Sequence, residues 1–413
     1  MIAMLIRRAP SASFSRGLRI VHVVRQYRPG IGGVEAFVSQ LAEAQARQGH
    51  LVRVITLNRI VDGAQQKLPA YERLNGVDVI RIPYVGSTRY AVAPTVLRHL
   101  SDVDLVHVHR VDFFADFLAA TRWLHHCPLV LSTHGGFFHT DFARRLKQWF
   151  FRTVTPRTLR GYAAVIASSE QDAALFSPIG GGKVLAVENG VDLQKFAGLA
   201  RPGSRTMIYF GRFTRHKGVD RVIAWFASLH RRAPEWTLIL AGRPAGLGPD
   251  EIGRMMADHG VASACELFVE PDDAVLRTLI ARSSVYVCAS SYEGFGIAAV
   301  EAVSAGLYPL LSPIPAFART LDRVGCGMAI PFLPDEDVDR FLEDFARHER
   351  ADGPTPAERV SSFGWDSVLA QINAVYVRAL AAGPKDPPAQ ARQRLVSAGL
   401  MTPGTAPSIS AGE

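Results

Sequence analysis

The stretch SYEGFGIAAVE at residues 291–301 decides the fold. It follows a short apolar run, VYVCA at 285–289, that is typical of a buried strand, and it leads into a helical stretch that ends at Gly306. Gly294 and Gly296 allow the backbone to approach a ligand closely. The free N–H groups and the dipole of a helix start favour an anion such as a diphosphate. The stretch therefore predicts an anion-binding loop between a parallel strand and its helix.

Two carboxylates frame this loop. Glu293 lies in the loop itself, and Glu301 lies about a turn and a half into the helix. Glu301 is placed to accept hydrogen bonds from a ribose, as acidic residues do in other nucleotide sites, and Glu293 faces whatever is attached to the phosphate. The alternative is a solvated loop glutamate and a surface helix glutamate. The two glycines and the preceding strand favour the ligand site.

Strand-like and helix-like segments alternate along the chain, which is the pattern of parallel α/β sheets. The predicted strands cover 18–24, 51–57, 77–82, 105–109, 129–132, 165–168 and 184–187, and then 207–210, 236–240, 265–269, 285–289 and 307–311. Apolar residues recur at helical spacing after the first strand, at Val34, Phe37, Val38 and Leu41. This order predicts two Rossmann-like halves in succession.

The composition changes at 197–204, a stretch rich in Ala, Gly and Pro, which indicates a boundary between two domains. The predicted parts are a basic extension (1–17), an N-terminal Rossmann-like domain (18–200), a C-terminal Rossmann-like domain (201–364), a helix (365–382) and a Pro/Ala/Ser/Gly-rich tail (383–413). We expect the tail to be disordered.

The composition of the 413-residue chain excludes several classes of protein. Its four cysteines form no C-x-x-C pair, which argues against a zinc site or a disulfide framework and fits a reducing cytosol. No uncharged apolar stretch reaches about 18 residues, so we expect no membrane span. Residues 1–200 hold 24 Lys/Arg and 14 Asp/Glu, a net charge of +10 against +8 for the whole chain. The first half therefore meets an anionic partner, either nucleic acid or an anionic lipid surface.

The loop GRFTRHKG at 211–218 follows the predicted strand 207–210 and opens a helix. Arg212 and Lys217 would place two cations at the carboxyl end of that strand, which suits a diphosphate. The alternative is a basic surface loop. The spacing of a P-loop is absent from this stretch.

The stretch STHGGFFH at 132–139 places His134 after another predicted strand, beside two glycines. A lone histidine is more often structural, and here the structural and functional readings carry equal weight. The stretch GIGGVE at 30–35 is a weak G-x-G-x-x-G fingerprint that lacks its third glycine, so an anion or sugar site there is as well supported as a dinucleotide site.

Residues 141–162 combine basic and aromatic side chains with a single acid, Asp141. The candidate docking residues are Arg144, Arg145, Lys147, Trp149, Phe150 and Arg152. A basic amphipathic helix with aromatics suits a membrane interface, because Lys and Arg reach the headgroups while Trp and Phe enter the boundary. The alternative is a core helix with a solvated basic face.

Together these motifs resemble the family 4 glycosyltransferases, retaining enzymes of the GT-B fold, in which two Rossmann-like domains face a cleft. The resemblance covers residues from about 18 to 380 and is greatest for the bacterial mannosyltransferases of xanthan- and acetan-type exopolysaccharide assembly. The stretches that carry it are HVVRQY at 22–27, STHGGFFHT at 132–140, VENGVD at 187–192 and EGFGIAAVE at 293–301. Those enzymes move mannose from GDP-mannose to a cellobiosyl-diphosphate-polyprenol and form an α-1,3 bond.

The resemblance implies a role for each matched residue of the donor site. Glu293 would contact hydroxyls of the donor sugar, and Glu301 would bind the ribose. Arg212 and Lys217 would hold the diphosphate and stabilise it as it leaves. The implied donor-binding residues are Gly32, Gly33, Arg212, Lys217, Gly294, Phe295, Gly296 and Glu301.

The remaining implied roles lie in the first half of the chain. His134 would lie beside the transferred sugar. Gly32 and Gly33 would present backbone N–H groups near the phosphates and the acceptor. Ser169 and Glu170 match a Ser-Glu pair of the family that has no settled role.

The resemblance also implies a same-face route, in which the leaving phosphate takes the proton of the acceptor, with no metal ion and no cofactor. It implies a cytoplasmic enzyme peripheral to the inner face of the bacterial plasma membrane. Two alternatives stay open: a family 4 glycosyltransferase with a UDP-sugar donor or a different acceptor, and a basic nucleotide- or nucleic-acid-binding protein without transfer activity. The paired Glu293 and Glu301 argue against nucleic acid, because carboxylates repel a phosphate backbone.

Overall fold

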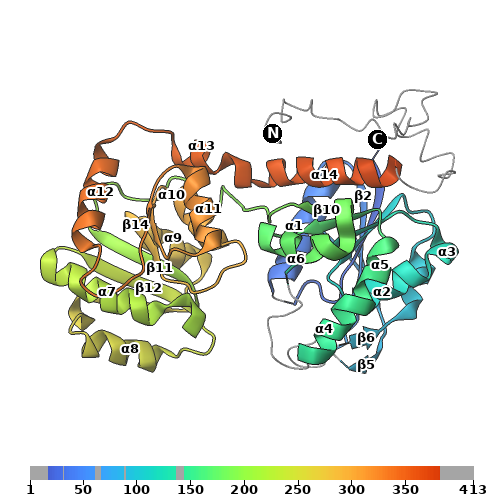
Figure 1. Cartoon of the computed structure of the whole chain (residues 1–413), viewed down its shortest axis with the longest axis horizontal. Coiled ribbons are helices and arrows are strands. Elements are labelled where there is room, and N and C mark those ends of the chain that lie inside the picture. Colours follow the sequence, from blue (N-terminus) through green and yellow to red (C-terminus); the bar gives the residue numbers. More distant parts are fainter. Residues whose placement is uncertain (1–16, 31, 61–66, 88–89, 136–143, 382–413) are drawn as a thin grey trace. The chain divides into compact units, whose positions relative to one another are not determined.

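The computed structural model describes residues 17–30, 32–60, 67–87, 90–135 and 144–381. The predicted tail, and the predicted extension apart from Gly17, lie outside these ranges. The chain divides into two compact units, Met1–Glu188 with Val368–Glu413, and Asn189–Ser367 (Figure 1). Each unit is built around its own parallel sheet.

The first unit contains an eight-stranded sheet in the order β10-β9-β8-β7-β1-β2-β4-β3, in which only β3 is antiparallel to its neighbour. Its elements are β1 (Arg19–Val23), α1 (Gly33–Arg47), β2 (Leu51–Leu57), β3 (Tyr71–Leu74), β4 (Val77–Ile82), β5 (Val85–Ser87), β6 (Tyr90–Val92), η1 (Pro94–His99), β7 (Leu105–His109), α2 (Phe113–Ala120), α3 (Arg122–His125), β8 (Leu129–Ser132), α4 (Arg144–Thr153), α5 (Thr155–Arg160), β9 (Ala164–Ala167), α6 (Glu170–Gly180), η2 (Gly181–Lys183) and β10 (Val184–Ala186).

The second unit contains a six-stranded parallel sheet in the order β13-β12-β11-β14-β15-β16. Its elements are β11 (Thr206–Phe213), η3 (Arg215–Lys217), α7 (Val219–Arg232), β12 (Thr237–Pro244), α8 (Pro249–Asp258), η4 (Ala262–Ala264), β13 (Cys265–Val269), α9 (Asp273–Ile280), β14 (Val285–Cys288), α10 (Ile297–Ala305), β15 (Tyr308–Leu311), α11 (Pro315–Val324), β16 (Met328–Ala329), α12 (Val338–Arg350), α13 (Pro356–Val360) and η5 (Ser361–Phe363). The final helix, α14 (Trp365–Ala381), begins here and joins the first unit from Val368.

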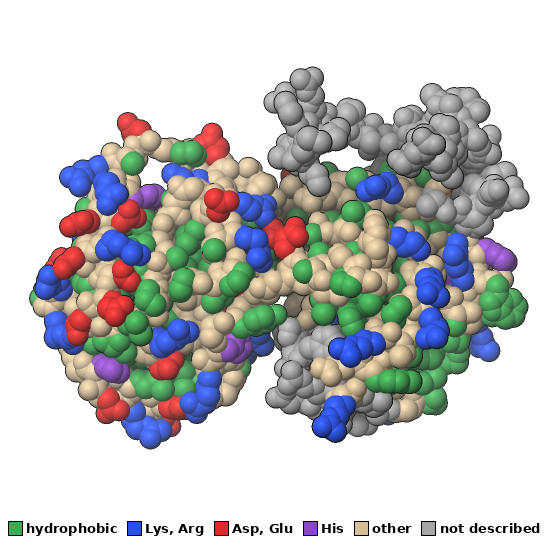
Figure 2. Space-filling view, viewed as in Figure 1, with side chains coloured by type: hydrophobic (Ala, Val, Ile, Leu, Met, Phe, Trp, Pro, Cys, Tyr) green, Lys and Arg blue, Asp and Glu red, His purple; other side chains and the backbone are tan. Residues whose placement is uncertain are grey.

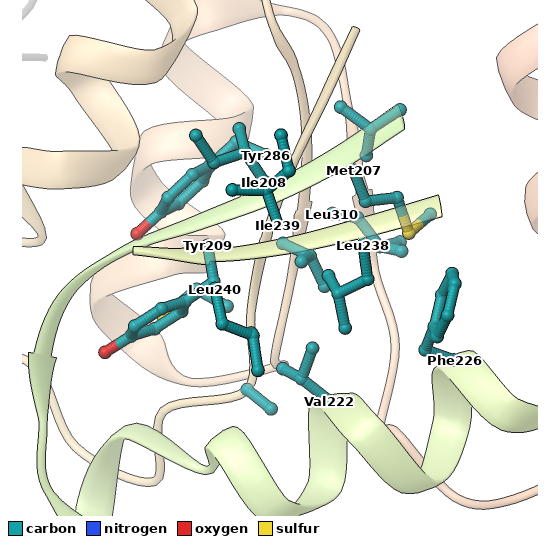
Figure 3. Close-up of a cluster of buried hydrophobic side chains, with 14 of the residues drawn as sticks. Met207, Ile208, Tyr209, Val222, Phe226, Leu238, Ile239, Leu240, Tyr286 and Leu310 are labelled. Atoms are coloured by element: carbon teal, nitrogen blue, oxygen red, sulfur yellow. The ribbon is translucent and has the colours of Figure 1, made fainter. Parts of the chain in front are cut away.

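Apolar packing between sheet and helix holds the second unit together. Residues of β11 and β12 such as Ile208 and Leu238 contribute to a large buried cluster, and α7 covers them with Val222 and Phe226 (Figure 3). All four side chains are fully buried. Burying a side chain of this size contributes about 1.5–3 kcal/mol, so each of these four residues adds to the stability of the unit.

The predicted alternation of strands and helices is confirmed, with small differences at the ends. The loop predicted to begin at Gly211 starts later, because Gly211, Arg212 and Phe213 continue β11 in register with β12. A Cβ atom on Gly242 would lie 2.0 Å from the Gly211 carbonyl oxygen, so glycine permits this close pairing.

Strands β3, β5, β6 and β16 were not predicted. The β3–β4 hairpin turns at Asn75 and Gly76, whose φ angles are +48° and +86°. An Asn-Gly pair is the strongest short-range hairpin signal, so the sequence did contain evidence for β3. The segment 197–204 lies within the second unit, where the Gly198 and Ala200 N–H groups donate to carbonyls at the end of α10.

Candidate active site

In the second unit, the loop after β14 meets the turn η3. The Lys217 ammonium forms an ion pair with the Glu293 carboxylate. The Ser290 hydroxyl donates to the same Glu293 oxygen at 2.7 Å. The Ser291 N–H donates to the His216 carbonyl at 2.8 Å, which ties the two loops together. The structure therefore brings Lys217 and Glu293, predicted separately, into one polar cluster.

Arg212 lies near this cluster at the end of β11. Its carbonyl accepts a hydrogen bond from the Tyr209 hydroxyl at 2.7 Å, and its side chain is exposed. Among the described residues, Arg212 forms no ion pair. Burial raises the pKa of Tyr209, and Glu293 raises it further while Arg212 lowers it, which places both charges close to this tyrosine. A cation without a carboxylate partner is suited to an incoming anion.

Helix α10 follows the loop that contains Glu293, and Gly296 is its N-cap residue. Gly296 has a φ of +87°, and a Cβ atom there would lie 2.8 Å from the Phe317 ring, so both conformation and space require glycine. The first N–H groups of a helix have no partner within it, and its dipole favours an anion. Gly294 is exposed, whereas the Phe295 side chain is buried, with its ring centroid 5.8 Å from that of Phe363. The Phe295 side chain thus anchors the loop in the core.

Glu301 lies on α10, partly buried. Burial raises its pKa to about 7, with Lys195 opposing the shift and Asp273 and Asp192 adding to it. A half-buried carboxyl that titrates near neutrality can accept or donate a hydrogen bond to a hydroxyl group. Glu293 lies in the loop before α10 and Glu301 lies in the middle of that helix, as the sequence predicted.

In the first unit, His134 follows β8 in a strained backbone conformation. Its φ is +52°, in the left-handed region that residues other than glycine seldom adopt. Asp172 holds the loop in place, because its carboxylate accepts from the Thr133 hydroxyl and from the Gly135 N–H at 3.2 Å. Ser169 in turn caps α6, accepting from the Asp172 N–H at 3.1 Å. Strain held by surrounding contacts is typical of a functional site.

Three further histidines lie behind His134, on two adjacent strands. His22 on β1 pairs in register with His107 on β7, and His109 follows two positions later on the same strand. All three are fully buried. His134 Nε2 lies 3.0 Å from His109 Nδ1, and His109 Nε2 lies 2.9 Å from His22 Nδ1. These three histidines were not predicted as part of a site, although HVH at 107–109 was a signal, since alternate residues of a strand share a face.

Ring nitrogens of His22, His107 and His109 lie within 4.8 Å of one another, close enough to hold a metal ion. Each of the six nitrogens already has a hydrogen-bond partner within the protein, so a metal ion would have to displace these partners. Elsewhere in the described ranges, no group of three such ligands is close enough to bind a metal.

Gly32 and Gly33 lie at the start of α1, where Gly32 is the N-cap residue in an extended conformation. Beside them is a cavity of about 660 Å³, lined in part by Arg28, Glu35 and Arg81. Gly32, at its edge, leaves room for the Glu35 carboxylate, which would lie 2.2 Å from a Cβ atom at that position. The cavity lies next to the predicted glycine loop, and its lining mixes charged side chains with apolar ones such as Leu68 and Leu74.

The predicted docking helix is α4. Arg145 and Arg152 are exposed, and Trp149 is 58% exposed, while Phe151 is buried against Phe176. The Arg144 side chain and residues 141–143 lie outside the described part of the chain. The helix therefore combines an inward apolar side with an outward basic and aromatic side.

Helix α3 adds Trp123 and Leu124, 70% and 50% exposed. On the face shown in Figure 2, basic and hydrophobic side chains cover the first unit, while acidic ones are visible mainly over the second. In the described part of the chain, we find no helix with both the length and the apolar character needed to cross a bilayer.

Comparisons with known proteins agree with this architecture. A family model described as Glycosyltransferase Family 4 matches residues 31–195, and one described as Glycosyl transferases group 1 matches residues 191–350. The solved structure of sucrose-phosphate synthase from Thermosynechococcus elongatus covers 88% of this chain and 99% of its own, with a TM-score of 0.64 and 20% identity. The structure of Anabaena Alr3699/HepE in complex with UDP and glucose covers 86% of this chain and 98% of its own, with a TM-score of 0.61 and 18% identity. The predicted GT-B fold is confirmed.

Curated relatives are similar over most of the chain. A protein of Xanthomonas oryzae pv. oryzae named GDP-mannose:cellobiosyl-diphosphopolyprenol alpha-mannosyltransferase is 40% identical over 88% of this chain and 97% of its own. A protein of the same name from Komagataeibacter xylinus is 38% identical over 88% of this chain and 94% of its own. The phosphatidyl-myo-inositol mannosyltransferase of Mycolicibacterium smegmatis is 28% identical over 86% and 92%. The chain is therefore a glycosyltransferase and belongs to glycosyltransferase family 4.

Proposed function

We propose that this enzyme transfers mannose from GDP-mannose to a polyprenyl-diphosphate-linked cellobiosyl acceptor, forming an α-1,3 bond with retention, in exopolysaccharide assembly. The main support is the 38–42% identity to relatives that carry this activity in their names. The observation in this chain that favours sugar-nucleotide chemistry is the cluster of Lys217 and Glu293 at the start of α10.

The donor would bind to the second unit. Its diphosphate would lie at the start of α10, where N–H groups and the cations of Arg212 and Lys217 converge. Glu301 would bind the ribose hydroxyls, and Glu293 would bind hydroxyls of the mannose. Ser290, which donates to Glu293, would keep that carboxylate oriented.

In the transfer step, the bond between the mannose anomeric carbon and the β-phosphate oxygen breaks. A bond from the acceptor hydroxyl oxygen to the same carbon forms on the same face, and the hydroxyl proton passes to the departing phosphate oxygen. GDP is the leaving group. Arg212 and Lys217 would stabilise its growing negative charge, a role that a metal ion fills in other transferases, so we propose that no metal and no cofactor is needed.

The acceptor would bind to the first unit while its lipid tail stays in the membrane. We propose that α4 and α3 place the enzyme on the cytoplasmic face of the plasma membrane. Trp149, Trp123 and Leu124 are exposed aromatic and aliphatic side chains beside exposed arginines. This combination suits an anionic bilayer surface, where each basic residue contributes about 1 kcal/mol.

Transfer of radiolabelled mannose from GDP-mannose to a synthetic cellobiosyl-diphosphate-polyprenol tests the proposal, with UDP-glucose as the competing donor. We expect a labelled lipid product whose linkage analysis gives an α-1,3 bond. An enzyme that uses GDP-mannose should bind GDP more tightly than UDP, so GDP should raise the melting temperature more at equal concentration. A ligand present at 100 times its Kd adds about 2.7 kcal/mol of stability. Transfer from UDP-glucose alone would instead favour the alternative of a UDP-sugar enzyme.

A further inference from the structure

A continuous chain of hydrogen bonds leads from His134 into the core of the first unit. From His134 it passes to His109 and then to His22, through the ring-to-ring contacts of 3.0 and 2.9 Å. His22 Nε2 then lies 2.7 Å from the Gln45 Oε1 atom of α1. The Gln45 amide nitrogen donates to the Tyr376 hydroxyl of α14 at 3.2 Å. Four elements of the unit thus contribute to one chain.

The chain continues beyond Tyr376 to a second end. The Tyr376 hydroxyl lies 2.7 Å from His107 Nδ1, and His107 Nε2 lies 2.7 Å from the Ser132 Oγ atom. Ser132 is the last residue of β8, two positions before His134. Both ends of the chain therefore reach the loop that carries His134.

A neutral imidazole has one N–H donor and one acceptor nitrogen, so rings joined nitrogen to nitrogen must all be oriented in the same direction. Because Gln45 presents its carbonyl oxygen, His22 must donate from Nε2 and accept at Nδ1. His109 then donates from Nε2 and accepts at Nδ1, and His134 donates from Nε2. The His134 Nδ1 atom is left as the unprotonated acceptor.

Tyr376 continues the chain in the same direction. Its hydroxyl accepts from the Gln45 amide nitrogen, so its own proton is available for His107 Nδ1. Burial raises the pKa of Tyr376, which keeps its hydroxyl proton in place. If the Gln45 amide turned over, every bond in the chain would have to reverse, and His134 would carry its proton on Nδ1 instead.

The rings change tautomer and not charge in this arrangement. Burial lowers the pKa of His22 to about 4, and burial together with Arg110 lowers the pKa of His134 to about 3. Burial also lowers the pKa of His107 and His109 well below the usual value. Phe37 packs edge-on against His134 at 5.0 Å. Neutral rings shielded by an aromatic side chain can hold one proton order over the physiological range.

We infer that Gln45 and Tyr376, acting through His22 and His109, are positioning residues that fix His134 as the Nε2–H tautomer with a hydrogen-bond acceptor at Nδ1. This inference rests on the proposed function for its consequence: a free Nδ1 accepts a hydrogen bond from a sugar hydroxyl, whereas the reversed chain offers a donor there. Among the described residues, the hydrogen bond of the His134 ring is made by Nε2 to His109.

Nuclear magnetic resonance of the full chain labelled with ¹⁵N-histidine reads the tautomer directly, because the two tautomers differ in the couplings between ring protons and ring nitrogens. The His134→Gln variant identifies the His134 signals. We expect the Nε2–H form in the native protein. In Tyr376→Phe, the Gln45 amide loses its anchor, so the Nδ1–H form of His134 should become detectable.

Tyr162→Phe is the matched control, since Tyr162 is also a fully buried tyrosine of the first unit and its hydroxyl donates to the Ala115 carbonyl, away from the histidines. It should leave the His134 tautomer unchanged. Transfer should fall about tenfold in kcat/KM in Tyr376→Phe and not in Tyr162→Phe, with GDP affinity retained in both, which corresponds to about 1.4 kcal/mol for one lost hydrogen bond.

Three outcomes would overturn the inference: an Nδ1–H tautomer in the native protein, an unchanged tautomer in Tyr376→Phe, or one bound metal ion per chain on the buried histidines by elemental analysis. The resonance measurement needs no substrate. A protein that shows the expected tautomers but transfers no mannose would contradict the proposed function and leave the hydrogen-bond chain intact.

Discussion

Acidification should destabilise the first unit and not the second, because four histidines in the core of the first unit resist protonation. A histidine in the unfolded chain takes up a proton as the pH falls through about 6.5. In the folded protein, burial lowers the pKa of His22 to about 4 and that of His134 to about 3, and it lowers those of His107 and His109 well below the usual value. Below pH 6.5 the unfolded state therefore binds more protons, and stability is lost as the pH falls toward the folded pKa values.

The size of the loss follows from the one proton that each histidine takes up in the unfolded chain. Between pH 7.5 and 5.5, each histidine that stays neutral in the folded protein lowers the free energy of unfolding by about 1.4 kcal/mol, so four lower it by about 5 kcal/mol. Asp112 of the same unit has the opposite effect, because burial raises its pKa to about 6. Its protonation in the folded protein adds about 1 kcal/mol to the free energy of unfolding at pH 5.5. A net loss of about 4 kcal/mol is a large share of the 5–15 kcal/mol that stabilises a typical domain.

The second unit should respond in the opposite direction. Burial raises the pKa of Glu301 to about 7, so the folded state binds a proton there that the unfolded chain releases above about pH 4.5. That contribution is fully present at low pH and is lost as the pH rises through 7. Lowering the pH from 7.5 to 5.5 should therefore raise the Glu301 contribution to stability by about 2 kcal/mol. His348 and His216 oppose part of this gain, because burial lowers the pKa of each.

Hydrogen–deuterium exchange with mass spectrometry separates the two units. Opening free energies, corrected for the intrinsic exchange rate at each pH, should fall in peptides covering β1 and β7 and should hold or rise in peptides covering β11 and β14. His107→Gln should reduce the slope of stability against pH by about one proton between pH 6 and 5. The exposed His259→Gln serves as the control for a histidine lost from the surface. If stability depended on pH with the same slope in both units, the buried histidines would not be the cause of the acid sensitivity.

Four further predictions concern the candidate donor site and the membrane-facing helix. Lys217→Ala should lower kcat/KM, with a loss of about 2–4 kcal/mol of transition-state stabilisation. A normal transfer rate in this variant would exclude a role of Lys217 in binding the diphosphate. Calorimetry with GDP should show a larger loss of affinity for Glu301→Ala than for Glu293→Ala, because ribose contacts act on the nucleotide alone; equal losses would contradict the division. Activity should persist in excess EDTA, and rescue by Mg²⁺ after full loss would disprove it. Reversing Arg145 and Lys147 to Glu should release the protein from anionic vesicles in co-sedimentation at low salt, with GDP binding retained as the control.

Much of the fold could be predicted from local sequence. The strands at 51–57, 77–82, 105–109 and 129–132 were predicted with the bounds that the structure has, because each is a short apolar run bordered by loop residues. The end of β11 was harder to predict, since Gly211 and Arg212 are residue types that are common in loops. Their strand conformation depends on pairing with β12, a partner that no local pattern identifies.

The candidate site divides in the same way. The SYEGFGIAAVE stretch at 291–301 identified Glu293, Glu301 and the glycine at the helix start, because glycines and carboxylates at a strand-to-helix loop have a chemical meaning by themselves. Lys217 was also predicted, but its ion pair with Glu293 became visible only when the fold brought β11 and β14 side by side.

Local sequence was thus enough to predict the alternation of strands and helices and to select the candidate residues of the loop at 291–301, since both depend on neighbours within about ten positions of the chain. Only the tertiary structure decided what surrounds His134. His107 and Tyr376 are 269 positions apart and meet because α14 packs on the first unit. A hydrogen-bond chain of this kind depends on distances and directions between distant elements, and residue types alone contain neither.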